Sequence, residues 1–292
     1  MTKKTTWLLP FVMFVGGMLH AQDYDYTYFS KKELPDAGIF LPAPPSFMST
    51  AFADDFQQWI WGKSIRDTQR GKMASLDSQW RMDRIVDIFG EALGITISEK
   101  DTPAIWKFVL NTGNTGYASV STAKKRYMRT RPFALMNEHV AGEFDDEQDL
   151  LEDGSYPSGH TAMGWSMALG LAEMAPDRQD EVLRRGYQYG ESRVIVGAHW
   201  QSDVEAARLA SSAAYACMHN SPEFQSELAA AKAEYRKIKG KMKEVKGYPN
   251  GELIMDPPPG PDDRRFYGDL AHYMLAKDER STARGQQAIL DA

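Results

Sequence analysis

The chain has very little cysteine: Cys217 is the only one in 292 residues. A single thiol cannot form an internal disulfide, so the fold must be stabilised by packing. Basic residues are also in the minority, with 34 Lys and Arg against 40 Asp and Glu and a formal net charge of −6. These shortages exclude a disulfide-stapled scaffold, and the acidic balance argues against a nucleic-acid partner, which would require a basic face.

Long apolar runs are scarce as well. The run 7–19 follows Lys3 and Lys4, is too short to cross a bilayer, and is followed by a small residue, Ala21. We interpret residues 1–21 as a cleaved signal peptide, which predicts a periplasmic or secreted protein; an uncleaved anchor is the alternative. Cleavage would remove the two lysines and change the formal net charge to −8. No later stretch of about 18 uncharged apolar residues follows, so no membrane span is expected after cleavage.

No alternating run is long enough to predict a strand. Apolar residues recur instead at spacings of three and four in 52–60 and 82–93, which is typical of amphipathic helices. A further helical pattern begins at Ile105 and is expected to loosen around Gly113 and Gly116. The sequence therefore predicts an all-α fold.

Composition divides the chain into segments. Residues 22–48 are rich in Tyr, Pro and Asp and lack a helical period, so we expect an extended N-terminal arm lying on the domain. Residues 49–245 are long enough to bury the core of one helical domain. Residues 246–292 include the run Pro257-Pro258-Pro259-Gly260-Pro261 and are expected to form a C-terminal extension.

A turn, Gly154-Ser155-Tyr156-Pro157-Ser158-Gly159-His160-Thr161, leads directly into the apolar segment 162–175. Ser158 can cap a helix, Gly159 leaves the backbone accessible, and His160 would stand in the first helical turn. The free N–H groups of a helix N-terminus bind anions; a simple cap with an incidental histidine is the alternative. Because the segment is apolar on nearly every side, it is predicted to be the buried central helix of a bundle.

Two cations precede this turn. Lys124 and Arg131 are seven residues apart, nearly two helical turns, so a helical segment would present both on one face. Pro132 is then expected to end that helix at Arg131. Other basic residues lie between them, and a solvated basic face is the alternative interpretation.

The segment 133–153 is strongly acidic and is predicted to be a surface loop, with His139 exposed in it. It lacks the alternating acidic pattern, central glycine and terminal Glu of a calcium loop. No cluster of Cys, His and Asp with metal-ligand spacing occurs elsewhere, so no metal site is predicted.

The third group follows the predicted central helix. His199 and Asp203 are four residues apart, so on one helix face the carboxylate could accept a hydrogen bond from the imidazole and set its tautomer. Gly197 is the expected break between a helix ending near Arg193 and another beginning near His199. A purely structural His–Asp pair is the alternative.

In order, the groups read Lys124, six residues, Arg131-Pro132; then Pro157-Ser158-Gly159-His160; then Ser192-Arg193, five residues, His199, three residues, Asp203. This pattern resembles the motif of the type 2 phosphatidic acid phosphatase (PAP2) superfamily. The vanadium haloperoxidases belong to the same superfamily. The octapeptide 154–161 resembles the signature of the bacterial class A nonspecific acid phosphatases. The resemblance runs from about 49 to about 239 and implies a helical bundle of the PAP2 and haloperoxidase type.

The resemblance implies an acid phosphatase that hydrolyses phosphate monoesters, such as nucleotides and sugar and aryl phosphates, through a phosphohistidine intermediate. It implies that His199 is the nucleophile, that Asp203 stabilises the cation formed, and that His160 is the general acid and then the base. An acidic pH optimum is expected, since His160 must begin protonated. The phosphate-binding residues implied are Lys124, Arg131, Ser158, Gly159 and Arg193.

Side-chain cations and a helix N-terminus can neutralise a bound phosphate, so no metal or other cofactor is expected, and vanadate is expected to inhibit as a phosphate mimic. One alternative is a vanadium-dependent haloperoxidase. Another is a non-enzymatic phosphate-binding surface protein, although binding alone needs no nucleophile with an orienting carboxylate. The expected partner is a small-molecule phosphomonoester, and the resemblance implies a homo-oligomer, with a dimer as the candidate state.

Overall fold

The structure, a computed structural model, describes residues 27–47, 49–80 and 82–240. All the secondary-structure elements in these ranges are helices, and none is a strand, which confirms the all-α prediction. The signal peptide predicted at 1–21, the C-terminal extension predicted at 246–292 and the first part of the N-terminal arm lie outside the described residues.

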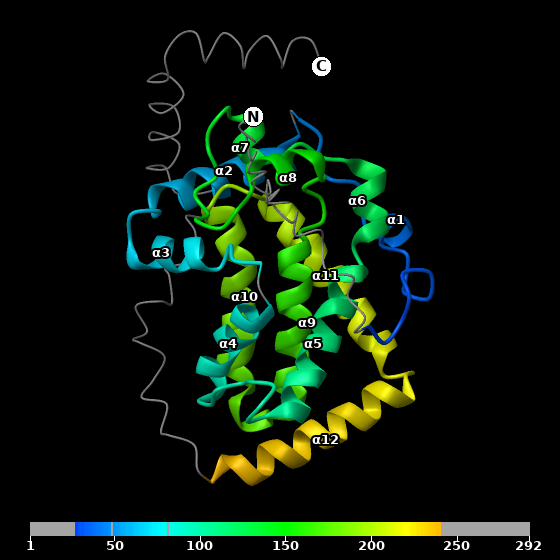
Figure 1. The fold of residues 1–292 in the computed structure, drawn as a ribbon. Coiled ribbons are helices and arrows are strands. Elements are labelled where there is room, and N and C mark those ends of the chain that lie inside the picture. Colours follow the sequence, from blue (N-terminus) through cyan, green and yellow to red (C-terminus); the bar gives the residue numbers. More distant parts are fainter. Residues whose placement is uncertain (1–26, 48, 81, 241–292) are drawn as a thin grey trace, which may run out of the picture.

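The chain forms a series of helices, which Figure 1 labels in chain order. They are α1 (Ala37–Phe40), α2 (Thr50–Ser64), α3 (Gln69–Leu76), α4 (Met82–Leu93), α5 (Pro103–Ala118), α6 (Ser121–Tyr127), α7 (Pro132–Leu135), α8 (Glu147–Glu152), α9 (Gly159–Met174), the 3₁₀ turn η1 (Pro176–Arg178), α10 (Gln179–Ile195), α11 (Gln201–Met218) and α12 (Pro222–Lys239).

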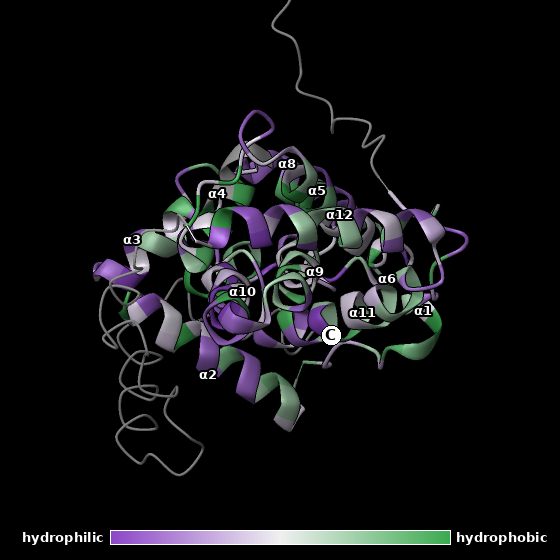
Figure 2. Ribbon diagram, turned by 90° about the horizontal axis from the view of Figure 1, so that it is seen from below, coloured by the Kyte–Doolittle hydropathy of each residue, from purple (hydrophilic) through white to green (hydrophobic). Residues whose placement is uncertain are grey.

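Helix α9 is the centre of the bundle. It packs against α5, α10 and α11, and the view from below in Figure 2 shows these helices around it. Met163, Met167 and Leu171 of α9 are fully buried and belong to the main hydrophobic core. A helix that is apolar on every side can remove its side chains from water only when other helices surround it. The observed position confirms the predicted central helix.

Helix α5 runs unbroken past two glycines, so the expected loosening at Gly113 and Gly116 is wrong. These glycines face α9: a Cβ on Gly116 would lie 2.0 Å from Oγ of Ser166, and one on Gly113 would lie 2.3 Å from Cε of Met167. Close packing of the two helices therefore offsets the low helix propensity of glycine, which is about 1 kcal/mol less favourable than alanine.

The connection between α10 and α11 turns sharply at Gly197, as predicted. Gly197 has a φ of +82°, which is accessible to glycine at little cost, and its N–H donates to the carbonyl of Val194 at 3.0 Å. Helix α10 ends at Ile195 and α11 begins at Gln201. This turn brings His199 to the end of the bundle where α9 begins.

The cation-bearing segment is not one helix, contrary to expectation. Helix α6 ends at Tyr127, Met128 takes a left-handed conformation with φ of 39°, and Arg131 is the N-cap of α7. Pro132 occupies the first turn of α7, where its missing N–H has no intrahelical acceptor to lose. The proline therefore begins a helix here and does not end one.

The N-terminal arm contains one helical turn, α1, where the sequence predicts an extended segment. Asp36 caps it, its Oδ1 accepting from the N–H of Gly38 at 2.8 Å, and α1 packs against α6. Nearer the N-terminus, the Tyr28 hydroxyl donates to Oε2 of Glu227 at 2.7 Å, and its ring packs edge-on against Phe224. These contacts fasten the described part of the arm to the bundle.

Candidate active site

The N-terminus of α9 forms one wall of the site. Ser158 is the N-cap, and its Oγ accepts from the N–H of Thr161 at 3.3 Å, as the sequence predicts. A Cβ on the next residue, Gly159, would lie 2.7 Å from Cε2 of Tyr117. The glycine therefore makes room for the Tyr117 ring beside the helix N-terminus.

His160 stands in the first turn of α9, with its ring edge-on to Trp80 at 4.4 Å between centroids. Its Nε2 lies 3.3 Å from the carbonyl oxygen of Ser78, which can only accept, so Nε2 carries a proton. Burial lowers the pKa of His160 well below its usual value, and the charge of Arg193 and the ring of His199 lower it further. Burial and these neighbours therefore favour the neutral form of the imidazole.

His199 lies between α10 and α11 and is buried. Its Nε2 is 2.9 Å from Nη1 of Arg131. A guanidinium can only donate, so Nε2 holds a lone pair and the proton of the neutral ring is on Nδ1. Burial lowers the pKa of His199 well below its usual value, and the charges of Arg131, Lys124 and Arg193 act in the same direction. His199 is therefore a neutral imidazole with its basic nitrogen directed at a cation.

Asp203 faces the other nitrogen of this ring. Its Oδ2 lies 3.5 Å from Nδ1 of His199 and accepts from the N–H of Trp200 at 2.8 Å. The expectation that both residues share a helix face is wrong, because α11 begins at Gln201, after His199. The pair forms because Asp203, in the first turn of α11, folds back over the helix N-terminus.

Lys124 and Arg131 are buried, so the solvated basic face considered from the sequence is wrong for them. Lys124 Nζ donates to the carbonyl of Gly154 at 2.6 Å, and Arg131 Nε donates to the carbonyl of Leu150 at 2.7 Å. Both also reach Oδ2 of Asp153, at 2.6 and 3.3 Å respectively. Burial is the main cause that lowers the pKa of Lys124 to about 8 and that of Arg131 to about 10.

Arg193, in the last turn of α10, is 0% exposed. Its Nη2 donates to Oδ1 of Asp145 at 2.7 Å. Its Nε and Nη1 are buried and have no hydrogen-bond partner among the described residues. Buried guanidinium N–H groups without acceptors are costly, and an anionic oxygen would satisfy them.

The acidic segment 133–153 is not simply the predicted surface loop. It contains α7 and α8, and it turns two carboxylates toward the cations: Asp145, whose side chain is 3% exposed, and Asp153, which is 51% exposed. The prediction for His139 is confirmed, since its side chain is 94% exposed. Sequence reasoning missed the two inward carboxylates because nothing in the run distinguishes them from their neighbours.

Sequence reasoning also missed Arg129, which it placed in the basic run. Arg129 Nη1 donates to Oδ1 of Asp203 at 2.6 Å, and its Nη2 donates to Oδ2 of Asp55, in α2, at 2.7 Å. The only available signal was its position two residues before Arg131, and spacing alone does not distinguish an inward arginine from a solvated one.

Within residues 27–47, 49–80 and 82–240, no group of three or more His, Cys, Asp or Glu side chains is arranged to hold a metal ion. In the same ranges no helix combines the length and apolar character that crossing a bilayer requires.

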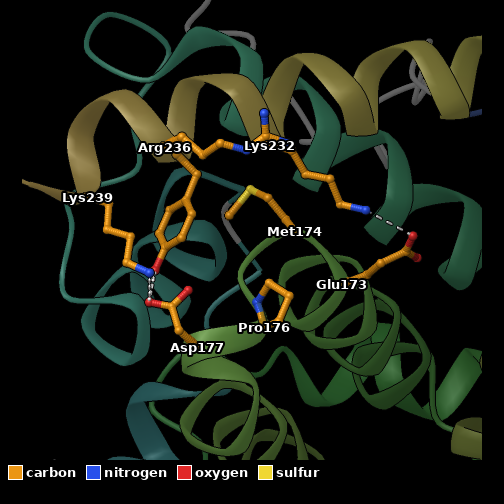
Figure 3. Close-up of a pocket in the computed structure, with 8 residues that line it drawn as sticks. Glu173, Met174, Pro176, Asp177, Lys232, Arg236 and Lys239 are labelled. Carbon is orange, nitrogen blue, oxygen red and sulfur yellow. Dashed lines mark hydrogen bonds and ion pairs between the residues drawn. The ribbon is translucent and has the colours of Figure 1, made fainter.

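A surface pocket lies between η1, the end of α9 and α12, away from both histidines (Figure 3). Four of its charged residues form two ion pairs: Lys232 Nζ lies 3.3 Å from Oε1 of Glu173, and Lys239 Nζ lies 2.8 Å from Oδ2 of Asp177. It contains neither a histidine nor an unpaired buried cation, so the candidate active site is the cluster at the other end of α9.

The PAP2 superfamily model matches residues 104–225, which contain all three groups of the site. The chain is 43% identical over 216 residues to a non-specific acid phosphatase of Providencia stuartii, covering 74% of this chain and 87% of the relative. It is 38% identical over 232 residues to a non-specific acid phosphatase of Salmonella typhimurium, covering 79% and 92%. It is 31% identical over 204 residues to an acid phosphatase of Zymomonas mobilis, covering 70% and 77%. The chain therefore belongs to the PAP2 superfamily, with the non-specific acid phosphatases.

Proposed function

We propose that this protein is an exported acid phosphatase that hydrolyses phosphate monoesters through a phosphohistidine on His199, without a metal ion. One observation carries the proposal: the neutral ring of His199 presents the lone pair of Nε2 to the guanidinium of Arg131, 2.9 Å away, with a carboxylate behind Nδ1. A phosphate bound by Arg131 would meet this lone pair. Such an arrangement supports nucleophilic attack, whereas phosphate binding alone needs only the cations.

In the first step, Nε2 of His199 attacks phosphorus, the N–P bond forms and the bond to the ester oxygen breaks. The ring becomes a cation, which the negative charge of Asp203 stabilises, with Oδ2 lying 3.5 Å from Nδ1. The leaving alkoxide takes the Nδ1 proton of a protonated His160, a form that the negative charge of the bound phosphate favours and whose Nε2–H is held by the carbonyl of Ser78. This contact leaves Nδ1 of His160 as the nitrogen that gains and loses the proton.

In the second step, the now neutral His160 removes a proton from water, and the water oxygen attacks phosphorus. The N–P bond breaks, inorganic phosphate leaves and the lone pair returns to Nε2 of His199. His160 thereby regains the proton that it gave to the alkoxide, so the cycle is balanced.

The charge of the transferring phosphoryl group would be balanced by Lys124, Arg131 and Arg193, together with Ser158 and the N–H of Gly159 at the start of α9. The partnerless Nε and Nη1 of Arg193 support this assignment, because they lack acceptors among the described residues. Three cations and a helix N-terminus supply the stabilisation that a divalent cation supplies in other phosphoryl-transfer enzymes. Activity is therefore expected to persist in the presence of a chelator.

The proposal includes a broad range of substrates, namely nucleotides and sugar and aryl phosphates. The names of the relatives from Providencia stuartii and Salmonella typhimurium, which describe them as non-specific, support this breadth. Export rests on the signal peptide proposed at 1–21, and homo-oligomerisation remains a prediction.

In the central experiment, the enzyme is mixed with a monoester that carries ³²P in its phosphate, and the reaction is then quenched rapidly without acid. The wild type is compared with His199→Ala. The wild type is expected to carry acid-labile label on one histidine, and His199→Ala to carry none and to turn over at background rate. His139→Ala is the matched control, because its side chain is exposed, and should label like the wild type. Near wild-type turnover by His199→Ala would remove His199 from the nucleophilic role.

Two additions test the remaining parts. Assays with and without EDTA test metal independence, and loss of activity with recovery on adding a divalent cation would contradict it. Assays of bromide oxidation with vanadate and peroxide test the haloperoxidase alternative, in which oxidation would be expected to dominate over ester hydrolysis. Vanadate itself is expected to inhibit hydrolysis competitively.

A further inference from the structure

We infer that Arg129 is a positioning residue for the nucleophile: it holds the carboxylate of Asp203 so that Asp203 fixes the tautomer and charge of His199. The inference rests on the proposed function, since it concerns the residue proposed to attack phosphorus. Arg129 lies outside the motif that identifies the phosphate-binding cations, and its side chain is only 9% exposed.

The two oxygens of Asp203 have different partners. Oδ2 faces Nδ1 of His199 and accepts from the N–H of Trp200, whereas Oδ1 accepts from Nη1 of Arg129 at 2.6 Å. Arg129 therefore binds the side of the carboxylate that points away from the histidine. Because Asp203 is fully buried, this contact is not weakened by solvent.

Arg129 is itself held from several directions. Its Nη1 also donates to Oγ of Ser202 at 2.8 Å, and its Nη2 donates to Oδ2 of Asp55 at 2.7 Å. The guanidinium carbon lies 5.6 Å from the ring centroid of Trp200, a cation–π contact. Asp55 in turn accepts from the N–H of Ser202 at 2.7 Å, so the whole group is anchored to the first turn of α11. A planar fork is needed to reach Asp55, Ser202 and Asp203 together.

The backbone of the same residues sets the distance between the nucleophile and the phosphate turn. The carbonyl of Arg129 accepts from the N–H of Ser155 at 2.9 Å, and the carbonyl of Asp203 accepts from the N–H of Ser158 at 3.0 Å. Arg129 and Asp203 are thus joined to each other by side chains and to the turn before α9 by main chains. A change in the contact between them would move His199 relative to the helix N-terminus.

The charges alternate along this chain of contacts: Asp55 is an anion, Arg129 a cation, Asp203 an anion, and His199 becomes a cation when phosphorylated. The cation of Arg129 offsets part of the negative charge that Asp203 presents to His199, while Asp203 still stabilises the imidazolium. Asp55 opposes part of that effect, since it shares the guanidinium. The two outer residues therefore act on His199 in opposite directions.

The experiment compares Arg129→Gln, Arg129→Lys and Asp55→Asn. The matched control is Arg126→Gln, which makes the same change three residues earlier at an exposed site where Nη1 donates to the carbonyl of Gly38. Steady-state kinetics are measured per folded enzyme across pH. The Nδ1–H proton of His199 is followed by NMR with ¹⁵N-labelled histidine, which also identifies the tautomer.

For Arg129→Gln, kcat is expected to fall about 10- to 100-fold, as for other partners that orient a functional side chain, with KM nearly unchanged. The acid limb of kcat should move to higher pH, because removing a cation near Asp203 favours the protonated ring of His199. Asp55→Asn should move it to lower pH, because an anion is removed. Arg129→Lys keeps the charge but not the fork, so kcat should fall while the limb stays in place.

The NMR signal tests the inference without relying on turnover. The Nδ1–H signal is expected in the wild type and in Arg126→Gln and to be lost or strongly shifted in Arg129→Gln. If Arg129→Gln keeps the wild-type signal, kcat and pH limb, or loses only thermal stability, the inference is wrong. If the wild type forms no phosphohistidine, the proposed function fails instead, while the signal still reports whether Arg129 orients the ring.

Discussion

Nη1 of Arg131 lies 2.9 Å from Nε2 of His199. The cation proposed to bind phosphate is therefore in contact with the nitrogen proposed to attack phosphorus. Because the guanidinium only donates, this contact and the carboxylate of Asp203 facing Nδ1 both favour the tautomer with its proton on Nδ1. The contact also implies that substrate must draw Arg131 from the histidine to the phosphate oxygens before attack. In the proposed mechanism, Arg131 thus links substrate binding to the release of His199 for attack.

Replacing Arg131 by lysine should therefore lower kcat/KM by about 10²- to 10³-fold, the usual cost of losing a donor that stabilises the transition state. Lysine keeps the charge but cannot donate at once to the carbonyl of Ala198, to His199 and to phosphate. Steady-state kinetics with an aryl phosphate provide the measurement. Arg184→Lys, at an exposed position of α10, should leave kcat/KM as in the wild type.

Asp153 is expected to compete with phosphate for the donors proposed to bind it, since its Oδ2 contacts both Lys124 and Arg131. Asp153→Asn should lower KM and the inhibition constant of inorganic phosphate about 2- to 5-fold, as expected from the 0.5–1 kcal/mol of a half-exposed ion pair. Asp149→Asn, exposed on α8, should change neither. A higher KM in Asp153→Asn would show that Asp153 holds the cations in place.

Phosphate binding should weaken as pH rises through about 8, because burial, with a smaller effect of Arg131, lowers the pKa of Lys124 to that value. Below it Lys124 is a cation, and above it the positive charge is lost. The inhibition constant of phosphate, measured from pH 6 to 9.5, should therefore rise on the alkaline side. Lys124→Arg should flatten this rise, since arginine stays charged. A wild-type constant that does not change over the range would contradict the assignment.

Acid should destabilise the protein. Burial lowers the pKa of both His160 and His199 in the folded state, so below about 6.5 the unfolded chain binds more protons than the folded one. The free energy of unfolding should therefore decrease as the pH is lowered through that range, by up to about 1.4 kcal/mol per pH unit for each histidine. Urea titrations from pH 7 to 4.5 measure the slope.

Matched variants identify the groups responsible for that slope. His160→Asn should reduce it, and His139→Asn, at an exposed position, should not. Bound vanadate should also oppose the loss of stability, because an anion favours the protonated rings. A slope equal in His160→Asn and the wild type would remove His160 from this account.

Gly197→Ala should destabilise the protein by roughly 1–2 kcal/mol, because its φ of +82° disfavours an L side chain. The added Cβ would also lie 2.6 Å from Nη2 of Arg66. Gly240→Ala is the matched control, since a Cβ there meets nothing within 4 Å. Equal unfolding midpoints for the two variants would show that the turn at Gly197 tolerates a side chain.

Much of the fold could be predicted because the signals are local. Ser158 caps α9, the helix ends at Met174 before Pro176, and Gly197 breaks α10 from α11, all within a few residues of the pattern that indicates them. Pro132 shows the limit of such signals. A proline is compatible with the end of one helix or the start of the next, and only the packing of the chain selects between them.

The glycines of α5 show the same limit in the core. The sequence predicts that Gly113 and Gly116 weaken the helix, whereas in the structure they allow α5 to pack closely against α9. The low helix propensity of glycine can be predicted from the local sequence. The packing that offsets it involves side chains about fifty residues away, Ser166 and Met167. Propensity alone cannot include that gain.

By itself, the sequence determined the all-α class, the central helix and the set of motif residues, because periodicity and fixed spacings along one chain encode them. Only the tertiary structure decided that Asp145 and Asp153 turn toward the cations while Asp149 meets solvent, and that Arg129 joins Asp55 to Asp203. The physical reason is that the partner of a buried charge is selected by where the folded backbone places it. Residues 55, 129 and 203 are far apart in the chain, and no spacing between them records that they meet.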